Sequence, residues 1–105
     1  MQCGFEDQRL RALCNSAKRL QETFGDRLAL HVQRILWSLD AAPNLADLSA
    51  SPPVSRRRVD KGSPSTFAVG PNGPGRIYFR ADMEPEPQTL SEIERIKIYD
   101  IEGTK

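Results

Sequence analysis

The chain has 105 residues, with 15 basic and 14 acidic side chains and a formal net charge of +1. This length supports one domain with a modest hydrophobic core, and no apolar run approaches the roughly 20 residues of a membrane-spanning helix. The first residues form neither a basic leader nor an apolar signal core. Two cysteines suit a reducing compartment, so we expect a single domain over residues 1–105, located in the cytoplasm.

Helical spacing of apolar residues dominates the first half of the chain. Asp7 is a candidate N-cap for a first short helix, and either Asn15 or Ser16 is a candidate N-cap for a second one. Gly25 indicates either a helix end followed by a new start at Asp26 or a kink within one longer helix. The sequence therefore predicts two or three N-terminal helices.

The longest predicted helix begins near Arg27 and ends before Pro43, because the residue that precedes a proline is pushed out of the helical conformation. Its apolar residues recur at the spacing of one helix face. We expect this row to be buried against a sheet: Leu28, Val32, Ile35, Leu36 and Leu39.

Beyond residue 53 the periodicity becomes that of strands. Residues 66–69 and 76–79 predict two short strands joined by the glycine- and proline-rich loop 70–75. Residues 95–101 alternate apolar and polar side chains, which predicts a strand with one buried face that holds Ile96, Ile98 and Asp100. The predicted fold is α+β, with the helices packed on one face of a curved antiparallel sheet.

Positive charge is concentrated in residues 54–80, which hold six basic side chains and one acidic side chain. Arginine can donate two hydrogen bonds to one phosphate, so this segment is a candidate site for an anionic polymer. Alternation along a strand would place Arg56 and Arg58 on one face and Arg57 on the other. The alternative is a solvated sheet edge that charge protects from association. The six basic residues are Arg56, Arg57, Arg58, Lys61, Arg76 and Arg80.

The single histidine, His31, leaves no His–His or His–Cys pair for a metal site or a nucleophilic triad. RNA cleavage through the 2′-hydroxyl needs a base, cations for the transition state and an acid. Converging cations can supply the second requirement without a metal. We therefore expect neither a metal nor a cofactor.

Several motifs, taken in their order along the chain, resemble the RelE/HigB superfamily of bacterial toxins, and most closely its "system killer" branch. The most specific are Leu-Cys-Asn-Ser at 13–16 and Ala-Ala-Pro-Asn-Leu-Ala-Asp-Leu at 41–48, followed by Lys-Gly at 61–62 and Phe-Ala-Val at 67–69. The resemblance covers nearly the whole chain and implies a RelE/ParE-like fold. It also implies the toxin of a type II toxin–antitoxin system, an endoribonuclease that cuts messenger RNA on the ribosome without a metal.

The same resemblance implies roles for individual residues. Arg58, Lys61 and Arg76 stand at basic positions of the family pattern, and Arg56 would bind phosphate. The family often closes with Asp-Ile-Glu-Asp-Tyr-His, whereas this chain closes with Asp-Ile-Glu-Gly-Thr-Lys, so Lys105 becomes the candidate for proton transfer. The expected catalytic residues are Arg58, Lys61, Arg76 and Lys105, and the expected RNA-binding residues are Arg56, Arg57, Arg80 and Thr104.

The implied partners are a cognate antitoxin, expected to be a small helix-turn-helix protein, together with messenger RNA and the ribosome. Operator DNA would be contacted only through the antitoxin, and no membrane is involved. Two alternatives remain. One is a catalytically degenerate binding module in an antitoxin-containing repressor complex, which the altered terminus favours. The other is a gyrase-directed toxin of the ParE branch, which the Lys-Gly and arginine positions disfavour.

Overall fold

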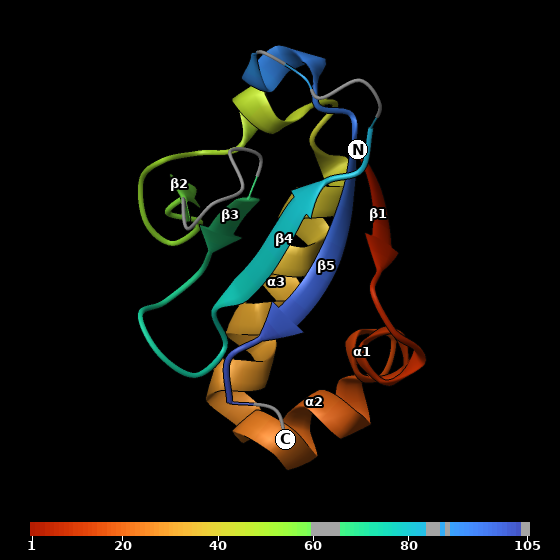
Figure 1. Ribbon diagram of the computed structural model, residues 1–105. Coiled ribbons are helices and arrows are strands. Elements are labelled where there is room, and N and C mark those ends of the chain that lie inside the picture. The colour runs from red at the N-terminus through yellow and green to blue at the C-terminus, as the bar shows by residue number, and fades with distance from the viewer. Residues whose placement is uncertain (60–65, 84–86, 88, 104–105) are drawn as a thin grey trace.

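The computed structural model describes residues 1–59, 66–83, 87 and 89–103 (Figure 1). Three N-terminal helices precede most of a five-stranded, mostly antiparallel sheet, which confirms the predicted α+β class. The elements are β1 (Gln2–Phe5), α1 (Gln8–Cys14), α2 (Ala17–Phe24), α3 (Asp26–Ala41), η1 (Leu45–Asp47), β2 (Arg57–Arg58), β3 (Thr66–Val69), β4 (Ile77–Ala81), η2 (Leu90–Glu92) and β5 (Arg95–Ile101).

Side-chain caps fix where the short helices begin. The Asp7 carboxylate accepts a hydrogen bond from the Leu10 backbone N–H at 2.9 Å, as predicted for α1. Ser16, rather than Asn15, caps α2, and its hydroxyl oxygen accepts from the Arg19 N–H at 3.2 Å. Gly25 has φ 83°, a conformation that favours glycine, and it separates α2 from α3. The chain therefore contains two helices here rather than one kinked helix.

Helix α3 runs behind β4 and β5 in Figure 1, so helix and sheet form two layers. Its buried residues are Ala29, Val32, Ile35 and Leu39. Leu28 and Leu36 of the predicted row also pack against the core, but both are only half-buried, so full burial is not found for Leu36. Both lie at the margins of the contact with the sheet, and Leu36 lines a surface hollow. No helix in the described part of the chain is long and apolar enough to span a membrane.

The sheet has the strand order β1-β5-β4-β3-β2. Strands β3 and β4 form the predicted hairpin, with Phe67 opposite Phe79 and Ala68 opposite Tyr78. Strand β1 was not predicted, and it pairs with β5 in parallel, so the expected all-antiparallel sheet is wrong at this edge. A four-residue segment with a central glycine carries no alternation signal. Its pairing with β5 defines it as a strand.

A register shift in the β4–β5 pair changes which side chain of β5 enters the core. Tyr78 pairs with Asp100, whereas Phe79 pairs with Ile98, so Tyr99 is the extra residue of a β-bulge. A bulge reverses the alternation beyond it. Asp100 is therefore exposed and Ile101 is buried, which corrects the prediction that Asp100 shares the face of Ile96 and Ile98.

The hydrophobic core lies between α3 and one face of the sheet. The stacked rings of Phe67 and Phe79, with centroids 5.9 Å apart, belong to it. Ile77, Ile98 and Ile101 from β4 and β5 are fully buried. Because this face holds the core, the remaining side chains of the central strands project from the opposite face.

Candidate nucleic-acid interface

One face of the sheet carries the basic and aromatic side chains. Arg57 is paired with Ala68, and Ala68 with Tyr78, whereas the neighbouring row of Phe67, Phe79 and Ile98 enters the core. Directly opposite residues share a face, so Arg57 and Tyr78 project away from the core. No helix of the described chain covers this face in Figure 1. We call this surface the open face and define it by Arg57, Arg76, Tyr78, Arg80, Lys97, Tyr99, Asp100 and Glu102.

Two guanidinium groups lie side by side at the end of β3. Arg57 Nη2 and Arg76 Nε both donate to the main-chain oxygen of Pro71, at 3.5 and 3.3 Å. Arg57 Nη1 also donates to the oxygens of Ser55 and Gly70, at 2.6 and 3.2 Å. Burial, followed by the charge of Arg76, lowers the pKa of Arg57, and the nearby Tyr78 opposes this effect. The two cations repel each other, and a shared anion would relieve that repulsion.

Neutral carbonyl oxygens hold both guanidinium groups without cancelling their charge. Within the described residues, the ion pair of the open face joins Arg80 to Glu6, and neither Arg57 nor Arg76 forms one. A pair of uncompensated guanidinium groups can bind a phosphate through several charge-assisted hydrogen bonds. The Arg57–Arg76 pair is therefore the candidate phosphate site.

A chain of hydrogen bonds continues from Arg76 across two strands. Arg76 Nη2 donates to Asn72 Oδ1 at 2.6 Å, and Nη1 donates to the Tyr78 hydroxyl oxygen at 3.1 Å. The Tyr78 hydroxyl donates to Glu102 Oε1 at 2.9 Å. Backbone hydrogen bonds of 2.8 Å join Glu102 to Gly75 and to Arg76, and they hold Glu102 in place at the end of β5. This series of hydrogen bonds therefore joins a cation, a phenol and a carboxylate beside the candidate phosphate site.

Two tyrosine rings lie next to each other on the open face, beside these hydrogen bonds. The rings of Tyr78 and Tyr99 have centroids 6.1 Å apart and an interplanar angle of 33°. The Arg80 guanidinium lies 5.9 Å from the Tyr99 ring centroid, and its NH2 group donates to the Glu6 carboxylate. Burial, then Tyr78 and Asp100, raise the pKa of Tyr99 above its ordinary value, and the nearby Arg80 opposes this effect. Aromatic rings beside arginines suit the stacking of unpaired bases.

The structure separates the arginines that the sequence grouped together. Arg57, Arg76 and Arg80 meet on the open face. Arg58 lies on the other face, with its guanidinium carbon 5.1 Å from the Phe67 ring centroid. The Arg56 Nε donates to the Leu48 carbonyl at 3.1 Å.

The predicted alternation, which places Arg57 and Arg58 on opposite faces, is therefore confirmed, and it leaves Arg58 on a different face from Arg57. The catalytic role assigned to Arg58 stays a prediction. Lys61, Thr104 and Lys105 lie outside the described residues, and their roles stay predictions as well.

The sequence analysis missed Tyr78, Tyr99 and Glu102 as members of the site. Alternation along β4 could have found Tyr78, because Arg76, Tyr78 and Arg80 recur at every second residue. Tyr99 and Glu102 gave no such signal. Their places depend on the register between β4 and β5, including the bulge.

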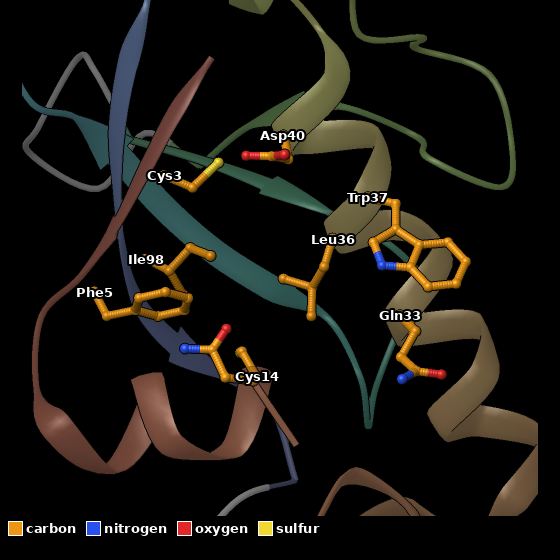
Figure 2. A pocket seen from close by; sticks show the side chains of 9 residues that line it. Cys3, Phe5, Cys14, Gln33, Leu36, Trp37, Asp40 and Ile98 are labelled. Carbon is orange, nitrogen blue, oxygen red and sulfur yellow. The ribbon is translucent and has the colours of Figure 1, made fainter. Parts of the chain in front are cut away.

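The surface hollow that Leu36 lines has a volume of about 310 Å³ and lies on the helix side of the sheet between β1, α1 and α3 (Figure 2). Its walls include Cys3, Phe5, Cys14, Leu36 and the largely exposed Trp37. Both cysteines are free thiols, and burial raises their pKa values to about 11 for Cys3 and about 12 for Cys14. The described residues that line this hollow include no cation, so it is not a candidate phosphate site.

No protein-family model matches the chain, and neither a curated protein nor a solved structure matches it significantly.

Proposed function

We propose that this protein is the toxin of a type II toxin–antitoxin system, an endoribonuclease that cuts messenger RNA on the ribosome without a metal. The observation that carries the proposal is the Arg57–Arg76 pair, two guanidinium groups without an ion-pair partner among the described residues. The motif resemblance supplies the reaction class. The open face supplies cationic and aromatic groups of the kind that this reaction needs.

The pair suits a reaction in which negative charge builds up on phosphorus-bound oxygens. When a ribose 2′-oxygen attacks the adjacent phosphate, the transition state gains charge on its two non-bridging oxygens. Arg57 and Arg76 are close enough to each other to bind both oxygens of one phosphate. Lys61, implied by the resemblance, would add a third cation. These side chains can therefore stabilise the transition state through charge alone.

The aromatic residues suit single-stranded RNA rather than a duplex. Tyr78 and Tyr99 present two neighbouring rings on a face without a covering helix among the described elements. Unpaired bases can stack on such rings, whereas the bases of a duplex are already stacked on one another. Messenger RNA held open in the decoding site of a ribosome is a substrate of this kind.

An exposed ribonuclease site must be blocked in a growing cell. We therefore propose a tight complex with a cognate antitoxin, a small helix-turn-helix protein that alone contacts operator DNA. We also place the protein in the cytoplasm, where the RNA substrate is found. Free Cys3 and Cys14 thiols suit that reducing compartment.

A second candidate function is a binding module that has lost catalysis and acts within a repressor complex. The replacement of the family's closing Asp-Tyr-His by Gly103, Thr104 and Lys105 favours this candidate. Such a module would bind the antitoxin and leave messenger RNA uncut.

Inducible expression without the antitoxin, followed by mapping of messenger RNA ends, separates the two candidates. The ribonuclease stops growth and produces new ends within translated codons, and Lys61→Ala abolishes both effects. Arg34→Ala, which removes an exposed arginine of α3 far from the open face, serves as the matched control and stays toxic. Uncut messenger RNA in cells that accumulate the folded protein would contradict the ribonuclease and favour the binding module.

A further inference from the structure

Tyr78 is the one tyrosine of the open face whose hydroxyl is held between a cation and a carboxylate. It accepts a hydrogen bond from Arg76 at 3.1 Å and donates its own proton to Glu102 at 2.9 Å. A phenolic oxygen has one proton and two lone pairs. Arg76 occupies one lone pair, and no other described residue donates to the second. The oxygen can therefore accept one further hydrogen bond, from a substrate hydroxyl.

We propose that Tyr78 is a catalytic residue of the reaction proposed above, and that it takes the proton from the attacking 2′-hydroxyl while it passes its own proton to Glu102. This inference rests on the proposed ribonuclease function and deepens it. Glu102 acts through Tyr78 and is therefore a positioning residue and final proton acceptor. None of the motifs that indicated a toxin assigns this role to either residue.

The position of Tyr78 relative to the candidate phosphate site supports the proposal. The Arg76 guanidinium carbon lies 5.8 Å from the Tyr78 ring centroid, and Arg76 shares the Pro71 carbonyl with Arg57. In RNA the 2′-hydroxyl is on the same ribose as the 3′-phosphate that it attacks. A phosphate bound by Arg57 and Arg76 therefore brings the 2′-hydroxyl close to the Tyr78 oxygen.

The charges on either side of Tyr78 suit a proton relay. A free tyrosine has a pKa near 10, and its neutral phenol is by itself a weak base. The Glu102 carboxylate removes the phenolic proton as the new one arrives, so a full phenolate never forms. Arg76 stabilises the negative charge that the oxygen gains during the transfer. The three groups together can therefore act as a general base.

The 2′-O–H bond breaks, the 2′-oxygen forms a bond to phosphorus, and the bond from phosphorus to the 5′-oxygen breaks. The proton of the 2′-hydroxyl passes to Tyr78, and the former proton of Tyr78 passes to Glu102. Water protonates the leaving 5′-oxygen, and Glu102 later returns its proton to water. The products are a 2′,3′-cyclic phosphate end and a 5′-hydroxyl end, with no oxidation or reduction.

The test measures single-turnover cleavage of messenger RNA on purified ribosomes between about pH 5 and pH 9. Tyr78→Phe keeps the ring and removes only the hydroxyl, and we expect it to slow cleavage by a factor of about 10² or more. The ratio of variant to unmodified rate is taken at each pH, which cancels the pH response of the ribosome. Glu22→Gln, on the exposed surface of α2, is the matched charge control and should leave the rate unchanged.

Glu102 is tested by the pH dependence of its variants. Glu102→Gln removes the proton acceptor, so the unmodified protein should be faster at neutral pH, and the two rates should converge as acid protonates the carboxylate. Glu102→Asp keeps a carboxylate and should retain the pH response of the unmodified chain. If Glu102 made only a structural contact, the ratio of the Glu102→Gln cleavage rate to the unmodified rate would instead stay constant with pH. Thermal unfolding followed by circular dichroism confirms that each variant is folded.

The outcomes separate the two proposals. If the unmodified protein cuts messenger RNA and Tyr78→Phe cuts it within about twofold of that rate, the relay is overturned and the ribonuclease stands. If the ratio of the Glu102→Gln rate to the unmodified rate does not vary with pH, Glu102 is only a structural contact and the relay is likewise overturned. If the folded, unmodified protein leaves messenger RNA intact under all conditions, the proposed function itself fails, and the relay fails with it.

Discussion

Arg57 and Arg76 donate to the same carbonyl oxygen, that of Pro71: Arg57 from β2, and Arg76 from the position just before β4, the two strands that flank β3. The loop after β3 therefore acts as a scaffold for cations. Its prolines lack N–H donors and could not form a phosphate cradle of backbone amides. Its carbonyl oxygens instead hold two guanidinium groups close together, and the phosphate-binding donors come from side chains.

The first prediction compares Arg57 with its neighbour Arg58. Arg57→Ala and Arg76→Ala each remove half of the candidate phosphate site, and each should slow cleavage by a factor on the order of 10². Arg58→Ala should have a smaller effect, because Arg58 lies over Phe67 on the other face. Cleavage rates on ribosome-bound messenger RNA provide the measurement, with Arg34→Ala as the control. A larger loss from Arg58→Ala than from Arg57→Ala would show that the open face is not the site.

The second prediction concerns α3. Leu39 is fully buried, so Leu39→Ala should lower the free energy of unfolding by roughly 2–5 kcal/mol. Leu36→Ala should cost clearly less, because Leu36 is half-buried and borders an existing hollow. Urea unfolding monitored by circular dichroism measures both values. Equal losses for the two variants would mean that Leu36 is covered in solution.

The third prediction follows from the raised pKa values of the two thiols, about 11 for Cys3 and about 12 for Cys14 against an ordinary value of 9.0. Folding favours the neutral thiols, so their contribution to stability is complete below about pH 9 and declines as pH rises toward 11 and 12. Cys14→Ala should therefore lose less stability between pH 8 and pH 10.5 than the unmodified chain. Denaturant unfolding at several pH values measures this difference.

The same shifts predict slow thiol chemistry in the folded protein, because the thiolate is the reactive form. Iodoacetamide at pH 8 should modify the native chain far more slowly than the urea-unfolded chain, as measured by mass spectrometry. Equal modification rates in the native and the unfolded chain would contradict the raised pKa values of Cys3 and Cys14.

The fourth prediction concerns Gly75, which has φ 94° and lies against α3. A Cβ atom there would come within 3.1 Å of Leu28 Cδ1 and 3.2 Å of Val32 Cγ2. Gly75→Ala should therefore cost both backbone strain and a clash, in total more than about 1 kcal/mol of unfolding free energy. Gly73, with φ 114° and no atom within 4 Å of its Cβ position, is the matched control for strain alone. Similar losses for both variants would show that the clash is relieved at no cost.

Local sequence signals predicted most of the helices and strands. The Asp7 cap acts within one turn of chain, so its effect can be read without tertiary contacts. The sequence left open the choice between Asn15 and Ser16 as a cap, and the choice between a stop and a kink at Gly25. The strand at 66–69 was predicted with its observed bounds, because the loop that follows it is rich in glycine and proline. Strand β1 escaped prediction because its main stabilising partner is β5, more than 90 residues later in the chain.

The candidate site, like the fold, was predicted from the sequence only in part. The sequence predicted Arg57 and Arg80 as RNA-binding residues and Arg76 as a catalytic residue; these roles stay predictions, and the structure brings the three side chains to one face. It could not show that Arg56 would bind the Leu48 carbonyl, because that bond depends on how the chain turns after η1. Nor could it place Glu102 beside Tyr78, since residues 24 positions apart meet only through strand pairing.

The sequence by itself determined the α+β class, the end of the longest helix before Pro43 and the concentration of positive charge in residues 54–80, because these depend on periodicity and composition. Only the tertiary structure decided which arginines share a face and which carboxylate faces Tyr78. The bulge at Tyr99 also reversed the alternation of β5 and moved Ile101, rather than Asp100, into the core. The physical reason is that strand register and twist bring distant residues together, and a shift of one residue moves a side chain to the opposite face of the sheet.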